Sequence, residues 1–177
     1  MPPQRIRGSP LSTHLSGLVV DERHSVSRRA RPRWLVAVDG SQHGDAALAW
    51  ASAHAAGAHA HLTVFCVSED LADRPSMYAL RTDAARILQL ALDDHARDVV
   101  EQAPAPPGVR VSRRWTRGHP ASAILEELAA QSYDLVVLGA LGHTASSRRF
   151  GGVARQVLRG ADVPVMVVPA KPLEMAA

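Results

Sequence analysis

Two glycine turns are the part of this sequence best suited to binding a charged ligand. The stretch 134–142 reads Asp-Leu-Val-Val-Leu-Gly-Ala-Leu-Gly, so glycines follow directly on four apolar residues. A short apolar run of this kind is typical of a strand that is buried on both faces. Further on, Gly151 and Gly152 open a helical stretch. Glycines between a strand and a helix start let backbone N–H groups approach a phosphate closely, so we expect an anion-binding site here.

The loop between the two glycine turns adds cations and hydroxyl groups. His143 is the histidine best placed for a phosphate contact, whereas His119, near a helix start, is interpreted as a turn residue. The alternative is a solvated loop whose arginines serve solubility. The loop residues that could reach a phosphate are Thr144, Ser146, Ser147, Arg148 and Arg149.

Other reactive side chains give little support for catalysis or metal binding. Ser41 has no His/Asp partner at the spacing of a nucleophile elbow. Cys66 lies in an apolar run and is predicted to be an inert buried thiol. His54, His59 and His61 are close in sequence, but His54 is expected on a helix and His61 on a strand, so a surface cluster is favoured over a metal site. Three tryptophans are interpreted as core or interface residues: Trp34, Trp50 and Trp115.

Length and composition indicate one globular domain with a basic tail. The chain has 177 residues, 46% of them hydrophobic, one cysteine, and no apolar run long enough to span a membrane. Residues 1–33 carry seven arginines and two acidic residues, so their charge is +5 and that of the remainder is −2. This balance argues against a nucleic-acid-binding domain. We expect a disordered tail over 1–33, a cytoplasmic domain over 34–170 and a short tail over 171–177.

Apolar runs alternate with helical patterns along the domain, which predicts an α/β fold. In the common strand order 3-2-1-4-5 of a parallel sheet with helices on both faces, the first and fourth strands are neighbours, and the crevice at their carboxyl ends is the expected ligand site. The second helix is expected to bury Leu80, Ala84, Ile87, Leu88 and Ala91, and the last one Ala154, Val157, Leu158 and Ala161. The predicted strands are 34–39, 61–67, 109–115 (near the sheet edge), 135–138 and 163–168, and the predicted helices are about 42–57, 77–102, 120 onward and 152–160.

Five motifs, taken in their order and spacing, resemble the universal stress protein family over about residues 33–169. They are Val-Ala-Val-Asp-Gly-Ser at 36–41, Gly-His-Pro at 118–120, the stretch 134–139 with Gly142, Val-Leu-Arg at 157–159, and Val-Pro-Val-Met-Val-Val-Pro at 163–169. The resemblance implies a single flavodoxin-like domain. It also implies a homodimer formed through the last strand, Val163 to Val168, whose apolar edge needs covering.

One branch of that family binds ATP through the pattern Gly-x2-Gly-x9-Gly-Ser/Thr. The resemblance implies that Asp39 approaches the adenine–ribose side, and that the base is lined by apolar residues at the strand ends. The full set of expected cofactor-binding residues is Ala37, Val38, Asp39, Val67, Leu138, Gly139, Ala140, Gly142, His143, Arg148, Gly151, Gly152 and Val153. Mg²⁺ could accompany the nucleotide at Asp39, although one carboxylate is a weak cation site.

The sequence departs from this pattern in two places. Eight residues, not nine, separate Gly142 from Gly151, and Gly152 stands where a Ser or Thr hydroxyl is expected. Counting to Gly152 restores nine residues, but Val153 follows and also lacks a hydroxyl. Losing one such hydrogen bond costs about 0.5–1.5 kcal/mol, roughly tenfold in affinity, which weakens binding without abolishing it.

These observations predict an adenine-nucleotide-binding stress-response protein that acts through partner or dimer contacts. No efficient catalysis is expected, because no nucleophile and general base are paired in the sequence. Two alternatives remain open at this point. One is a nucleotide-free homodimeric interaction protein of the same fold with a vestigial cleft, and the other is a weak ATPase.

Overall fold

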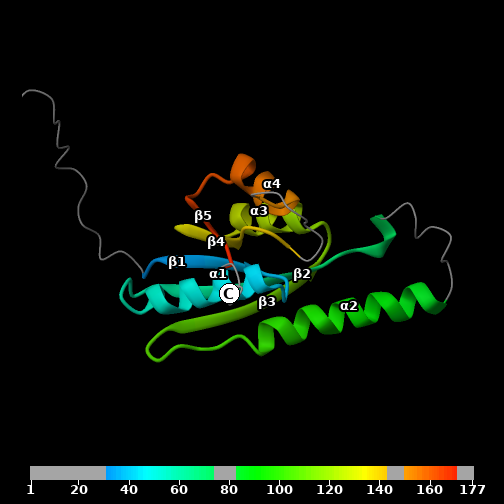
Figure 1. The fold of residues 1–177 in the computed structure, drawn as a ribbon, viewed down its shortest axis with the longest axis horizontal. Helices are drawn as coiled ribbons and strands as arrows, with labels where there is room; N and C mark the ends of the chain where they lie inside the picture. Colours follow the sequence, from blue (N-terminus) through cyan, green and yellow to red (C-terminus); the bar gives the residue numbers. More distant parts are fainter. Residues whose placement is uncertain (1–30, 74–82, 143–149, 171–177) are drawn as a thin grey trace, which may run out of the picture.

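The fold is a five-stranded parallel sheet with helices on both faces (Figure 1). The computed structural model describes residues 31–73, 83–142 and 150–170. The strand order is β3-β2-β1-β4-β5, so the predicted α/β class and the order 3-2-1-4-5 are confirmed. The elements are β1 (Arg33–Val38), α1 (Gln42–Ala55), β2 (His61–Ser68), the 3₁₀ helix η1 (Leu71–Asp73), α2 (Asp83–Glu101), β3 (Arg110–Arg117), α3 (Pro120–Ala130), β4 (Leu135–Gly139), α4 (Gly152–Gly160) and β5 (Val165–Val168).

Alternate residues of the central strands build two separate cores. Val36, Val64 and Val137 pack with α1 and α2 on one face. On the other face, Leu35 and Val136 pack with α3 and α4. Successive side chains of a strand point to opposite faces, so one apolar run supplies both cores. Figure 1 shows α3 and α4 together on one side of the sheet and α2 on the other.

The register of the strands leaves an opening at their carboxyl ends. β1 and β4 are neighbours, with Ala37 paired to Leu138. β2 continues for two residues beyond Cys66, the partner of Val38, and pairs there with β3. Because the chain leaves β1 and β4 toward opposite edges of the sheet, nothing in the sheet itself fills the space between their ends. No helix within the described ranges is long and apolar enough to cross a bilayer.

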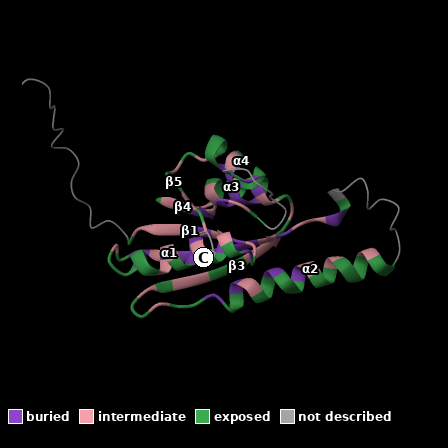
Figure 2. Ribbon diagram, viewed as in Figure 1, coloured by how far each residue is buried: buried purple, intermediate pink, exposed green. Residues whose placement is uncertain are grey.

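The predicted buried face of α2 is wrong. Ile87 is 66% exposed and Leu88 is 43% exposed, and Ala84 and Ala91 are also exposed. Figure 2 shows most of this helix as exposed or half-buried. The apolar stripe points away from the sheet because polar side chains face the sheet in the first half of α2. These polar side chains are hydrogen-bonded. The residues of α2 that are buried are Asp93, Ala96 and Val100, and Leu80 lies outside the described residues.

The last helix and strand differ from the prediction in smaller ways. Ala154 and Val157 are buried as expected, but Leu158 is 43% exposed and Ala161 is half-buried. β5 begins at Val165, two residues later than predicted. Pro164 has no N–H to donate to the ladder, although its carbonyl accepts a hydrogen bond from the Val136 N–H at 3.0 Å.

The observed face of α2 can be tested by two truncations on the same helix. Val100 is 2% exposed, so Val100→Ala should lower the free energy of unfolding by about 1.5–3 kcal/mol through lost burial and the cavity left behind. Ile87→Ala should change it by no more than about 0.5 kcal/mol, because the side chain is already in water. Urea denaturation measures both. A larger loss for Ile87→Ala would support the face predicted from periodicity.

Candidate ligand-binding cleft

A cavity of about 510 Å³ opens at the carboxyl ends of β1, β2 and β4. Its size falls in the range of small-molecule sites. The predicted cofactor-binding residues that the structure describes all line it, although they come from four separate segments. They are Ala37, Val38, Asp39, Val67, Leu138, Gly139, Ala140, Gly142, Gly151, Gly152 and Val153. His143 and Arg148, with the rest of their loop, lie outside the described residues.

Asp39 is held at the start of α1. Its Oδ1 accepts a hydrogen bond from the Ser41 N–H at 3.0 Å. Ser41 is the N-cap of α1, and its Oγ accepts from the Gly44 N–H at 3.1 Å. A carboxylate at the amino end of a helix is favoured by the helix dipole, so Asp39 is held in place as an anionic hydrogen-bond acceptor at the cavity.

Two of the glycines leave no room for a Cβ atom. A Cβ atom added to Gly139 would lie 2.6 Å from the carbonyl carbon of His43 and 2.9 Å from the nitrogen of Gly44. A Cβ added to Gly44 would lie 2.7 Å from the Asp39 carboxylate. The first turn of α1 therefore rests directly against the end of β4. A larger residue at Gly139 would push these two elements apart, and one at Gly44 would displace the Asp39 carboxylate.

The other glycines border the cavity. A Cβ added to Gly142 would lie 3.1 Å from Oδ2 of Asp39, so this glycine lets the second turn approach the carboxylate. Gly151 is the N-cap of α4 and provides no side chain to cap the first turn. A Cβ added to Gly152 would meet nothing within 4 Å. Among the described residues, no side chain caps the N–H groups at the start of α4 and none lies close to Gly152, which is the geometry that favours an anion.

The sequence profile of the universal stress protein family matches residues 31–169. The chain belongs to the universal stress protein family. A search of curated proteins finds no match to it.

Solved universal stress proteins share the fold. The chain is similar to universal stress protein UspA from Lactobacillus plantarum, at 26% identity and a TM-score of 0.65, with 79% of this chain and 99% of that one covered. It is also similar to a family member from Arabidopsis thaliana with AMP bound, at 16% identity and a TM-score of 0.53, covering 82% and 96%. A third neighbour is a universal stress protein in complex with cAMP, at 22% identity and a TM-score of 0.52, covering 79% and 98%.

In this universal stress protein, sequence reasoning missed one wall of the cleft. Ser68 is the last residue of β2 and Glu69 follows it, so the rule that ligands bind at strand ends could have identified them. The contribution of α2 carried no such signal, because the face of that helix was predicted wrongly. The missed cavity-lining residues include Ser68, Glu69, Leu71, Leu88, Leu92 and His95, and also Gly44, Phe65, Cys66, Ala96, Pro120, Ile124, Leu141 and Ala154.

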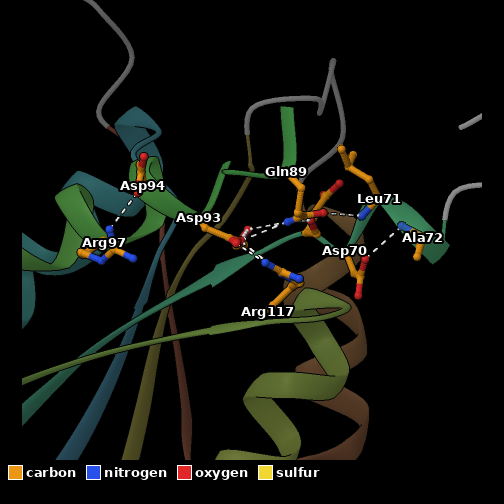
Figure 3. Close-up of polar contacts among 10 residues, drawn as sticks. Asp70, Leu71, Ala72, Gln89, Asp93, Asp94, Arg97 and Arg117 are labelled. Atoms are coloured by element: carbon orange, nitrogen blue, oxygen red, sulfur yellow. Dashed lines mark hydrogen bonds and ion pairs between the residues drawn. The ribbon is translucent and has the colours of Figure 1, made fainter. Parts of the chain in front are cut away.

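A buried polar cluster stands behind this wall (Figure 3). Asp93, 5% exposed, accepts hydrogen bonds from the Ser68 hydroxyl at 2.6 Å and from the Gln89 amide at 3.0 Å. The guanidinium of Arg117 donates to both carboxylate oxygens, with Nε at 3.3 Å. These donors stabilise the charged form and lower the pKa of Asp93 to about 2, with the Arg117 hydrogen bond the largest cause.

Two expectations about other side chains can be compared with the structure. The predicted burial of Cys66 is confirmed, and burial, followed by the nearby charge of Asp39, raises the pKa of its thiol to about 12. His54 stacks on Trp50 with ring centroids 4.4 Å apart, whereas His61 lies within 2.9 Å of the Ser112 hydroxyl on β3. Among the residues that the structure describes, no group of three His, Cys, Asp or Glu could hold a metal ion.

Asp93→Asn should lower the free energy of unfolding at pH 7 by about 1.5–3 kcal/mol, because a buried charge-assisted hydrogen bond is lost. A pKa lowered to about 2 means that the native state favours the carboxylate. This stabilisation is therefore complete above about pH 4 and is lost as the pH falls toward 2. Denaturation curves of wild type and variant should converge over that window.

Asp94→Asn is the matched control, because Asp94 is 65% exposed, and should cost at most about 0.5 kcal/mol. Equal losses for the two variants would contradict the assigned cluster.

The thiol of Cys66 should be unreactive in the native protein. A pKa raised to about 12 leaves very little thiolate at pH 8, and thiolate is the reactive form. Labelling with an aromatic disulfide reagent should be more than about 100-fold slower than in urea-unfolded protein, where the thiol returns to its ordinary pKa. Rapid labelling of the folded protein would contradict this.

Proposed function

We propose that this universal stress protein binds an adenine nucleotide, ATP, in the cleft and acts in the cytoplasm through contacts that change with nucleotide occupancy. The observation that carries the proposal is that one cavity brings together the carboxylate of Asp39 and the uncapped start of α4. A ribose can donate hydrogen bonds to the carboxylate, while the phosphates occupy the helix start. Two family members of the same fold have AMP and cAMP bound, which supports a nucleotide as the ligand class.

The end of β2 supports adenine as the base. The Ser68 carbonyl accepts from the Gly118 N–H at 2.9 Å, on the β3 side. Carbonyls of successive residues in a strand point to opposite neighbours, so the carbonyl of Val67 points to the side of β1, which ends at Val38. A backbone carbonyl at this position can accept from the 6-amino group of adenine. Ala37 and Leu138 offer apolar surface for the ring.

The phosphate end explains why binding is expected to be weak. Gly152 leaves open space where the family pattern has a hydroxyl, so the phosphates would rely on backbone N–H groups. Mg²⁺ would enter coordinated mainly by the nucleotide's own phosphates, since the described residues offer no cluster of three ligands. We expect no efficient hydrolysis. Ser41 caps α1 and Cys66 is a neutral thiol, so neither is an activated nucleophile.

The two sheet edges differ in a way that favours a homodimer through β5. The edge strand β3 carries Arg110, Arg113, Arg114 and Arg117, and charged residues discourage pairing with another chain. β5 reads Val-Met-Val-Val, and Met166 is 37% exposed. A two-fold symmetric contact along β5 would cover this apolar edge, and each protomer of the dimer would keep its own cleft.

Gly152→Ser should strengthen ATP binding by up to about tenfold, because it supplies the missing hydroxyl in space that is already open. Isothermal titration with ATP and Mg²⁺ measures the dissociation constants. Gly152→Ala is the matched control, since it adds the Cβ alone, and should bind like the wild type. A flat trace for wild type and Gly152→Ser at submillimolar ATP would favour the rival function, a nucleotide-free interaction protein with a vestigial cleft. Phosphate release above background that disappears in Asp39→Ala would instead indicate a weak ATPase.

A further inference from the structure

We propose that Gln89 and Asp93 are positioning residues for the base end of the cleft, and that they set its selectivity for a 6-amino purine over a 6-oxo purine. This inference rests on the proposed nucleotide binding. It concerns residues that do not themselves contact the base. They act through the backbone of Val67 to Leu71, which borders the cavity.

The first half of α2 has no apolar anchor on the sheet. Its large apolar side chains are exposed, with Ile87 at 66% and Leu90 at 52%, and buried residues begin only at Asp93. Leu88 and Leu92 nevertheless line the cavity. The contacts that tie this part of the helix to the cleft are therefore polar ones, made by Gln89 and Asp93.

Gln89 holds the segment after β2 by both ends of its amide. Its Oε1 accepts from the Leu71 N–H at 2.9 Å, and its Nε2 donates to the Glu69 carbonyl at 3.2 Å. The same Nε2 lies within hydrogen-bond distance of Ser68 Oγ and Asp93 Oδ1. Figure 3 shows Gln89 reaching toward this segment, with Asp93 beside it on the left.

Asp93 fixes the residue next to the proposed base acceptor. Ser68 is 3% exposed and is held on two sides, by its hydroxyl to Asp93 at 2.6 Å and by its carbonyl to the Gly118 N–H at 2.9 Å. Arg117, from β3, closes the cluster around the carboxylate. With Ser68 held in this way, the peptide between Val67 and Ser68 cannot rotate freely, and the Val67 carbonyl stays directed past the end of β1.

A fixed carbonyl discriminates between purines by whether the group at position 6 donates or accepts a hydrogen bond. It accepts a hydrogen bond from a 6-amino group, but it repels a 6-oxo group, which is itself an acceptor. A carbonyl that can turn away loses the attraction for adenine and also the repulsion of hypoxanthine. Loosening the cluster should thus reduce selectivity for the 6-amino purine. A general destabilisation of the protein would instead weaken the binding of both nucleotides alike.

The test compares ATP with ITP, which differ at the purine 6 position, by isothermal titration on the full-length protein. Gln89→Met and Ser68→Ala each remove polar contacts of the cluster at little change in volume. We expect each variant to bind ATP about five- to tenfold more weakly than wild type and to bind ITP within about twofold of wild type. The dissociation constant for ITP divided by that for ATP should therefore fall. Gln156→Met, on the exposed side of α4, and Asp94→Asn are the matched controls and should leave the ratio unchanged.

Hydrogen exchange of the ligand-free protein gives a second readout. The Leu71 amide should exchange faster in Gln89→Met than in wild type, while core amides of β1 and β4 keep their protection. If wild type binds neither nucleotide, the proposed function fails and this inference fails with it. If wild type binds ATP, this inference alone is overturned when both variants leave the ratio of the ITP and ATP dissociation constants unchanged. Equal weakening of the two nucleotides is one way to obtain that result.

Discussion

The cleft depends on how closely the start of α1 approaches the end of β4. The backbone of His43 and Gly44 rests on Gly139 at distances that leave no room for a Cβ atom. This contact holds the turn after β1 beside the turn after β4, and so it sets the separation of Asp39 from the glycines opposite. The parallel pairing of β1 with β4 brings the two turns to one edge of the sheet, and the contact between backbones determines the width of the opening.

The glycine pattern consequently serves two purposes. Gly139 and Gly44 are required by the fold whether or not a ligand binds, because their neighbours are backbone atoms or the Asp39 carboxylate. Gly152 has open space where a side chain would stand, so no contact with the described residues requires a glycine there. A motif read from sequence merges these positions into one signal. Only the surroundings of each glycine separate a packing requirement from a place where a phosphate could approach.

The sheet and the glycine-lined side of the cleft could be predicted from the sequence because their signals are local. Apolar runs such as Leu135 to Leu138 mark buried strands, and parallel topology places Asp39 and Gly142 at the same edge. The wall formed by α2 could not be predicted in this way. Periodicity assumes that the apolar stripe of a helix is the buried one, and in α2 a hydrogen-bonded stripe of Gln89 and Asp93 faces the sheet instead. The partners that make burial of Asp93 favourable, Ser68 and Arg117, lie 24 or more residues away in the chain, so no local pattern reveals them.

The two walls of the cleft are thus held by different forces. The wall made by α1, β1 and β4 rests on backbone contact and a continuous apolar core, which yields little without unfolding the domain. The wall made by the first half of α2 rests on a few hydrogen bonds around one carboxylate, and none of its large apolar side chains is fully buried. Local opening is drawn from the parts of a fold with few buried apolar contacts. A ligand that touches both walls would therefore shift the second far more than the first. The exposed stripe that begins with Ile87 would move with it, so occupancy of the cleft would be transmitted to the surface through α2.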